Sequence, residues 1–122
     1  MPFSIRRKRI YDPAEPDDGV RILVDRLWPR GIRREDAQIE EWCRDIAPSS
    51  AIRKVFSHEA DRFPAFAAAY REELDASEAA AAFLARCRGW LGQTNVTFLY
   101  AAKDTVHNNA AVLQAWADDA LK

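Results

Sequence analysis

Hydrophobic and polar residues alternate in two segments near the beginning of the chain, as in β-strands. The segment from Phe3 to Arg9 predicts a first strand, although its alternation is weak. The segment from Val20 to Asp25 predicts a second strand, because β-branched residues occupy every second position from its start. Between the two, Tyr11 to Gly19 contains two prolines, four acidic residues and a final glycine, which indicates a loop.

In the middle of the chain, the apolar residues recur at the spacing of a helix. A helix is predicted over about Glu35 to Asp45, with acidic residues in its first turn. Its expected apolar face has the spacing i, i+3, i+4, i+7 and consists of Ile39, Trp42, Cys43 and Ile46.

Three further helices are predicted downstream, the last of them ending at the turn from Gly92 to Asn95. Ser49 or Ser50 is expected to cap a short helix, because a serine hydroxyl accepts hydrogen bonds from the free N–H groups of a first helical turn. Asp61 and Ser77 are the expected caps of the next two helices.

Val96 to Ala101 is the most apolar strand candidate and is predicted to lie in the centre of the sheet. A final helix is predicted from about Val106 to Ala120. If the strand at 96–101 pairs in parallel with the strand at 20–25, the helical middle of the chain connects them. The expected fold is therefore a small single-domain α/β layered fold over residues 1–122, with a short, mostly parallel sheet flanked by helices.

In such a sheet, ligands bind beyond the carboxyl ends of the strands. Two polar loops follow the predicted parallel strands, one from Asp25 to Gly31 and one from Ala102 to Asn109. We expect both loops to open at the same edge of the sheet, and the site to lie there.

Composition excludes several classes of protein. Apolar residues make up 48% and charged residues 30% of the 122, which is usual for a globular domain. Cys43 and Cys87 lie in apolar helical patterns outside any Cys-x-x-Cys or Cys/His cluster, so we expect buried thiols in a reducing compartment and no metal site. No segment resembles a signal peptide or a membrane span, which predicts a cytoplasmic protein without a membrane partner. No cofactor-binding motif occurs, and we expect the protein to bind no cofactor.

The charge is unevenly distributed, although the net charge is only −1. Residues 1–34 contain nine basic residues against five acidic ones, whereas the rest of the chain contains nine against fourteen. This asymmetry favours an anionic partner for the basic end. A basic edge strand that resists aggregation would produce the same pattern.

The loop from Asp25 to Gly31 combines a carboxylate, two guanidinium groups and an indole. Asp25 is a candidate catalytic or orienting carboxylate, and Arg26 and Arg30 suit a phosphate or carboxylate ligand. Trp28 would stack on a planar group. In the structural alternative, Trp28 fills the core and Asp25 pairs with an arginine.

The second loop supplies the other candidates. Lys103, the second candidate catalytic residue, stands at a strand end before a helix start, where anions bind. Asp104 is a candidate ligand-binding residue or the helix cap, and His107 a candidate proton carrier or a passive polar residue. Asn108 and Asn109 would orient the polar edges of a ligand.

Three segments resemble the YeaO-like proteins, which belong to the family called domain of unknown function 488. They read KRIYDPAEPDDGVRILVDRLWPRGI, EEWCRDIAPSSAIRKVF and FLYAAKDTVHNNAAVL, and the resemblance spans essentially the whole chain. It implies a small cytoplasmic protein of bacteria or archaea without an assigned activity. Its signature positions are Tyr11, Asp12, Asp25, Arg26, Trp28, Pro29, Arg30, Gly31, Pro48, Ser49, Arg53, Phe56, Lys103, Asn108 and Asn109.

The resemblance changes the interpretation of the second loop in two ways. The position of His107 is less constant in the family, which argues against an essential base there. Longer relatives carry a Cys-His-Arg run near this point, and this chain has no cysteine there, so thiol chemistry is not expected.

Three functions remain open. The first is a small enzyme or binding domain for an anionic, nucleotide-like ligand held by the two loops. The second is a nucleic-acid-binding module that uses the basic run from Arg6 to Arg9. The third is a non-catalytic interaction protein, a monomer or a homodimer with an apolar face around Trp42 or Trp90.

Overall fold

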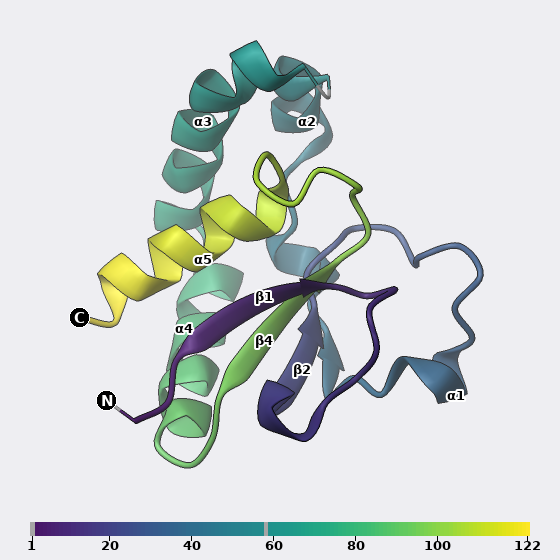
Figure 1. Cartoon of the computed structure of the whole chain (residues 1–122). Helices are drawn as coiled ribbons and strands as arrows, with labels where there is room; N and C mark the ends of the chain where they lie inside the picture. The colour runs from purple at the N-terminus through teal and green to yellow at the C-terminus, as the bar shows by residue number, and fades with distance from the viewer. Residues whose placement is uncertain (1, 58) are drawn as a thin grey trace.

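The computed structural model describes residues 2–57 and 59–122, in which four strands form one parallel sheet in the order β1-β4-β2-β3 (Figure 1). The strands are β1 (Ile5–Arg9), β2 (Val20–Leu23), β3 (Glu41–Trp42) and β4 (Val96–Tyr100). The α-helices are α1 (Arg34–Ala37), α2 (Ser50–Phe56), α3 (Phe63–Asp75), α4 (Glu78–Leu91) and α5 (Asn109–Ala120). Single 3-10 turns lie at Pro16–Asp18, Arg44–Ile46 and Ala60–Arg62. The predicted α/β fold with a parallel sheet flanked by helices is confirmed.

β4 is the central strand, as its apolar sequence predicts. All five of its residues are buried, and it pairs in parallel with β1 on one side and β2 on the other. The ladders continue beyond the strands, since Ile10 N donates to Tyr100 O and Val24 N donates to Leu99 O. The carboxyl ends of β1, β2 and β4 therefore meet at one edge of the sheet, where their loops begin.

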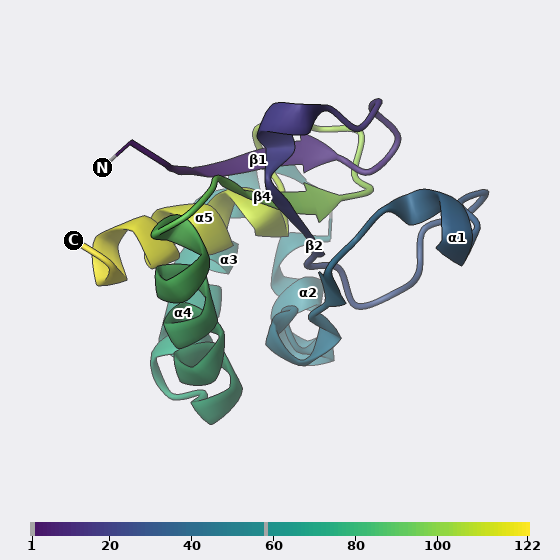
Figure 2. The same cartoon turned by 90° about the horizontal axis from the view of Figure 1, so that it is seen from below.

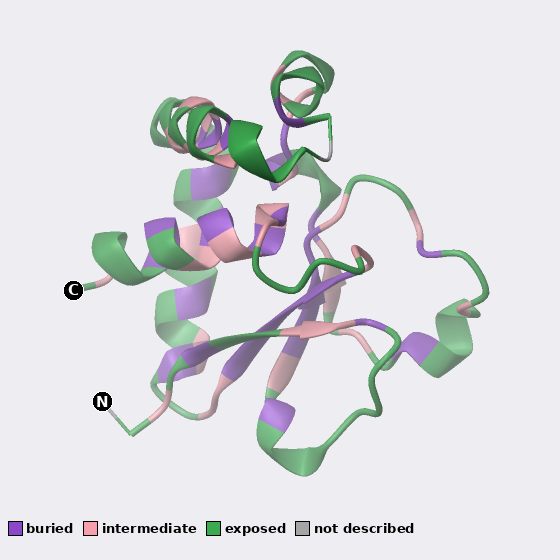
Figure 3. Cartoon of the chain, turned by 45° about the horizontal axis from the view of Figure 1, so that its top comes forward, coloured by how far each residue is buried: buried purple, intermediate pink, exposed green. Residues whose placement is uncertain are grey.

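The two faces of the sheet are covered differently. Helices α2 to α5 lie on one face (Figure 2), where Ile22, Val24 and Phe98 belong to the large core. On the other face, Leu23 and Leu99 belong to a smaller core, which the loop after β2 covers. Alternate residues of each strand point to opposite faces, so both faces need apolar side chains. This explains why β2 and β4 are buried almost throughout (Figure 3).

The helix predicted over Glu35 to Asp45 is wrong. Only the short α1 forms, and it ends at Gln38 in the left-handed conformation with φ of 52°. The chain then enters β3, which pairs with Ile22 and Leu23 of β2. The apolar residues that suggested a helix instead place Trp42 and Cys43 beside the sheet. Backbone N–H groups of this segment donate hydrogen bonds to carbonyl groups of β2 in place of helical partners.

Two of the predicted helix caps are confirmed. The hydroxyl oxygens of Ser49 and Ser77 accept hydrogen bonds from Ile52 N and Ala80 N. The prediction for Asp61 is wrong, because this residue lies inside a 3-10 turn from which α3 continues without a side-chain cap.

The last helix begins three residues later than predicted, at Asn109 instead of Val106. Its cap is Asn108, whose side-chain oxygen accepts from Ala111 N at 2.8 Å, and not Asp104. Asp104 instead accepts from the backbone N–H groups of Val106 and His107, which closes a turn before the helix.

The two tryptophans expected on an apolar outer face are both half-buried. Trp42 packs edge-on against Trp28 in the smaller core, and Trp90 packs against the large core. The exposed large apolar residues are Tyr11, Leu27, Val55 and Val106, of which two line the cavity described next.

Candidate functional site

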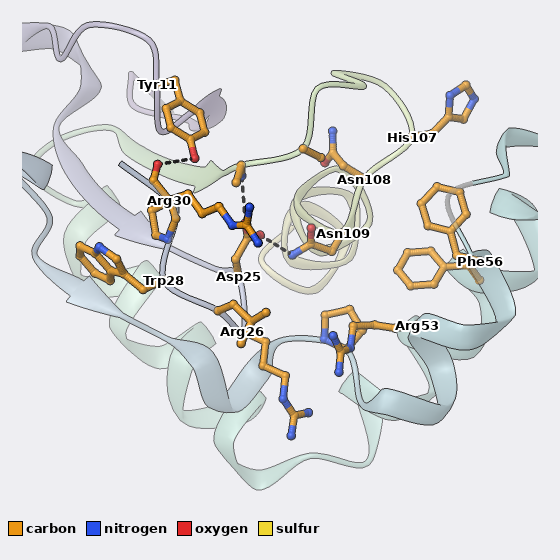
Figure 4. Close-up of a pocket in the computed structure, with 16 residues that line it drawn as sticks. Tyr11, Asp25, Arg26, Trp28, Arg30, Arg53, Phe56, His107, Asn108 and Asn109 are labelled. Carbon is orange, nitrogen blue, oxygen red and sulfur yellow. Dashed lines mark hydrogen bonds between the residues drawn. The ribbon is translucent and has the colours of Figure 1, made fainter. Parts of the chain in front are cut away.

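A cavity of about 470 Å³ opens at the edge where the parallel strands end (Figure 4). Its volume lies within the range of small-molecule sites, about 300–1,000 Å³. The loops after β1, β2 and β4 contribute to its lining, together with α2, α3 and the start of α5. The lining residues are Tyr11, Asp25, Arg26, Leu27, Trp28, Pro29, Arg30, Pro48, Arg53, Phe56, Phe66, Ala101, Ala102, His107, Asn108 and Asn109. The prediction that the two polar loops meet at one edge of the sheet is thus confirmed.

Asp25 lies at the centre of this cavity, two residues after the end of β2 (Figure 4). One carboxylate oxygen accepts a hydrogen bond from Ala101 N at 2.9 Å, and the other accepts from Asn109 Nδ2 at 3.1 Å. The carboxylate has no ion-pair partner in the described part of the chain, contrary to the structural alternative raised from the sequence. Burial raises the pKa of Asp25 more than these two hydrogen bonds lower it.

Asn109, the first residue of α5, holds Asp25 in place. Its side-chain amide donates to Val24 O at 3.2 Å as well as to the Asp25 carboxylate. A single amide thus ties the end of β2 to the start of α5. The orientation of Asp25 depends on a residue 84 positions away in sequence.

Asn108 has a different role from its neighbour. It is buried, with 2% of its surface exposed, and its amide donates to Asp104 O at 2.9 Å while its oxygen caps α5. Both ends of the side chain are engaged by backbone groups. Asn108 therefore shapes the cavity wall and has fewer groups available to a ligand than Asn109.

Three arginines line the cavity: Arg26, Arg30 and Arg53. All three are exposed, and none forms an ion pair with a described residue. Figure 4 shows Arg30 in front of Asp25 and Arg53 on the α2 side, whereas Arg26 extends away from the centre. Tyr11 donates its hydroxyl proton to Arg30 O at 2.9 Å and so anchors the loop that carries Arg30.

The eleven arginines outside the cavity lining differ in their partners. Six of them pair with carboxylates: Arg6 with Asp17, Arg21 with Asp18, Arg33 with Asp36, Arg62 with Glu59, Arg71 with Asp119 and Arg86 with Glu41. Three arginines and one half-buried carboxylate thus leave the cavity with a net positive charge.

Trp28 is mainly a packing residue. Its indole N–H donates to Ile32 O at 2.7 Å, and its ring meets Trp42 edge-on with centroids 5.2 Å apart. The Arg34 guanidinium lies 4.7 Å from the ring centroid. With its N–H bonded and neighbours on its ring, Trp28 supports the cavity wall from the smaller core and is a poor stacking platform.

The remaining candidates of the second loop lie at the rim or outside. His107 lines the rim, where Nδ1 bonds to Asp104 at 2.9 Å and the ring meets Phe63 edge-on. Hydrogen bonds from His107 N and Val106 N and from the imidazole lower the pKa of Asp104 to about 2. Lys103 is exposed, and neither it nor Asp104 lines the cavity. The structure thus brings Asp25, the two asparagines and three arginines together but not Lys103.

Several lining residues lie outside the two loops from which the site was predicted. Arg53 and Phe56 come from α2, and Tyr11 comes from the loop after β1. The family resemblance was the signal for these three, since all of them are among its signature positions.

The lining limits the chemistry of the site. It contains no serine, threonine, cysteine or lysine, so the described side chains offer no conventional covalent nucleophile of these types. The residues the structure describes also include no group of three histidine, cysteine, aspartate or glutamate side chains able to hold a metal ion. Burial raises the pKa of the Cys43 and Cys87 thiols to about 12, which makes both unreactive.

The basic run on β1 is already engaged within the protein. Arg6 pairs with Asp17, and Lys8 pairs with Glu15 and Asp18. Arg7 donates to Gln114 Oε1 at 2.6 Å, and the Arg9 guanidinium donates to two backbone carbonyls of the loop after β4. Most of this charge therefore organises the protein's own loops.

Comparison with known proteins gives one family. Residues 4–122 match the family model DUF488-N3i, described as the inactive DUF488-N3 subclade. The chain is 44% identical over 114 residues to the uncharacterised protein YeaO of Escherichia coli K12, covering 93% of this chain and 96% of that protein. It is 43% identical over 109 residues to the uncharacterised protein Rv3073c of Mycobacterium tuberculosis H37Rv, covering 89% of each. No solved structure matches the chain significantly. None of the helices in the described residues has the length and apolar character required to cross a membrane.

Proposed function

Since this chain belongs to the YeaO-like DUF488 family and matches a subclade described as inactive, we propose that it binds a small anionic molecule without transforming it. The family membership confirms the resemblance seen in the three sequence segments. The proposed binding site is the cavity at the carboxyl ends of β2 and β4.

The observation that carries this proposal is the set of three arginines without carboxylate partners around one cavity. Guanidinium groups bind phosphate or carboxylate through paired N–H donors, and each such charged hydrogen bond contributes about 1.5–3 kcal/mol. The walls around the cationic groups are apolar, with Phe56, Phe66 and Pro48 among them. A ligand with one anionic end and one apolar or planar part would match both features.

Binding without turnover agrees with the state of Asp25. Its carboxylate is held by Ala101 N and Asn109, and no histidine or lysine among the described residues bonds to it. A general base must pass on the proton that it takes, and no titratable side chain among the described residues is bonded to Asp25 to receive it. Asp25 is better suited to orienting a ligand than to cycling a proton.

Isothermal titration with inorganic pyrophosphate, a sugar phosphate and a set of nucleoside monophosphates tests the proposal. We expect at least one to bind, and Arg30→Ala and Arg53→Ala each to weaken binding by about tenfold or more, since each removes a charged hydrogen bond. Arg26→Ala should have a smaller effect, because this side chain extends away from the centre.

The matched control is Arg88→Ala. Arg88 is exposed on α4, outside the cavity lining and without a carboxylate partner among the described residues, so this variant loses the same charge elsewhere. Its affinity should stay within about twofold of the wild type. The proposal fails if no anion binds, or if Arg30→Ala and Arg53→Ala bind as well as Arg88→Ala.

A further inference from the structure

The carboxylate of Asp25 has acceptor capacity that the protein leaves unused. An ionised carboxylate offers about four lone-pair positions. Asp25 receives one hydrogen bond on each oxygen, from Ala101 N and from Asn109 Nδ2. Each oxygen can accept once more, and no described cation pairs with either.

Asn109 adds a further acceptor beside it. Its two amide protons are directed to Val24 O and to the Asp25 carboxylate, which leaves its side-chain oxygen without a partner among the described residues. The floor of the cavity thus presents acceptors, while the arginines present donors. A half-buried acceptor pair with apolar residues nearby favours a ligand that brings N–H groups.

Building on the proposed function, we propose that the ligand is a phosphorylated compound of the guanine type, with its ring edge on Asp25 and its phosphate on Arg30 and Arg53. Guanine carries a ring N–H and an exocyclic amino group side by side, and this pair matches the two oxygens of a carboxylate as a guanidinium does. A volume of about 470 Å³ can accommodate a ligand of this size.

The same geometry rejects the other bases. Adenine and cytosine place a ring nitrogen acceptor next to their amino group, which would face a carboxylate oxygen and leave it unpaired. Hypoxanthine keeps the ring N–H but lacks the amino group, and so loses one hydrogen bond. Xanthine replaces the amino group by a carbonyl, which opposes the carboxylate. A site that recognises polar groups in this way discriminates strongly against analogues that lack them.

The apolar walls are consistent with a flat ring between them. Phe56 and Phe66 come from α2 and α3, and Pro29 comes from the loop after β2. A planar ring bound to Asp25 would therefore contact apolar side chains without needing an exposed indole.

Titration of the wild-type protein with GMP, IMP, AMP and XMP tests the inference without any substitution. We expect GMP to bind about tenfold more tightly than IMP. Its affinity should exceed those of AMP and XMP by about tenfold or more. Equal affinity for the four nucleotides, or a preference for AMP, would overturn it.

Asp25→Asn then tests whether this residue reads the base. The amide keeps one acceptor and replaces the other oxygen by an N–H donor, so XMP should become the preferred ligand over GMP. The expected change in the GMP-to-XMP affinity ratio is about a hundredfold. Retention of the GMP preference in a folded Asp25→Asn protein would overturn the inference.

These outcomes separate the inference from the function on which it rests. If the four nucleotides bind with equal affinity, or no more tightly than pyrophosphate, and Arg30→Ala weakens their binding, the anion site stands and the guanine assignment is wrong. If no anion binds to the wild type, both are wrong.

Discussion

Replacement of Asn109 by alanine removes the amide that joins β2 to α5 and tests how the cavity floor is held together. The variant loses a hydrogen bond of 3.1 Å to the Asp25 carboxylate and one of 3.2 Å to Val24 O. Asn109 is only half-buried, so water entering from the cavity can replace part of what is lost.

The expected magnitude follows from these two contacts. A hydrogen bond to a charged group contributes about 1.5–3 kcal/mol and one to a backbone carbonyl about 0.5–1.5 kcal/mol. Rehydration reduces this sum, and alanine is the better helix former by about 0.5 kcal/mol. We expect a loss of about 2 kcal/mol in the free energy of unfolding, which corresponds to about 6–10 °C in Tm for a chain of this size.

Urea unfolding followed by circular dichroism measures this loss in Asn109→Ala, Asp25→Ala and the double variant. The double-mutant cycle should give a coupling of about 1–2 kcal/mol, because the two side chains are direct partners. Gln93→Ala is the matched control, since it removes an exposed amide with no side-chain hydrogen bond among the described residues. Additive effects of Asn109→Ala and Asp25→Ala, or a loss in Asn109→Ala no larger than in Gln93→Ala, would refute the reasoning.

Two further predictions concern the Asp25 carboxyl and the loop before β2. Because burial raises the pKa of Asp25, the folded protein holds its proton more tightly than the unfolded chain, and the contribution of Asp25 to the free energy of unfolding should fall as pH rises from 3.8 through the raised pKa. Urea unfolding over about pH 4 to 7 should show the wild type losing stability relative to Asp25→Asn as pH rises, and parallel curves for the two proteins would contradict it. Gly19→Ala should cost about 3 kcal/mol or more by the same assay, since φ is 66° and a Cβ would lie 2.0 Å from Asn95 O. Gly31→Ala, with φ of 78° and nothing within 4 Å of the new Cβ, should cost about 1 kcal/mol, and equal losses in the two variants would show that the contact with Asn95 is unimportant.

Local patterns in the sequence were sufficient to predict several elements of the fold. The alternation in β2, the apolar run of β4 and the serines before α2 and α4 predict elements that the structure contains. These features depend on neighbours a few residues away, which strand period and helix capping describe well. The position of the cavity at the carboxyl ends of the strands followed from the parallel pairing of β2 and β4.

The failures have a common physical cause, which is competition from contacts that the local pattern does not reveal. The segment after α1 has helical spacing but pairs with β2, because Arg21 O and Leu23 O accept hydrogen bonds from Glu40 N and Cys43 N. Asp104 has the chemistry of a cap, yet the chain turns once more before Asn108 caps α5. In both places a tertiary or longer local contact outweighs a preference worth about 1 kcal/mol or less.

The sequence by itself determined that this chain forms a parallel α/β sheet and that the loop after β2 carries a carboxylate and two arginines. Only the tertiary structure decided which residues share the cavity. Arg53 joins Arg30 because α2 packs beside the strand ends, while Lys103 stays outside because its loop turns away before α5 begins. The same packing gave Trp28 a place in the smaller core and left Asp25 held by Asn109, since the position of a side chain in a cavity depends on contacts between segments that are far apart in the chain.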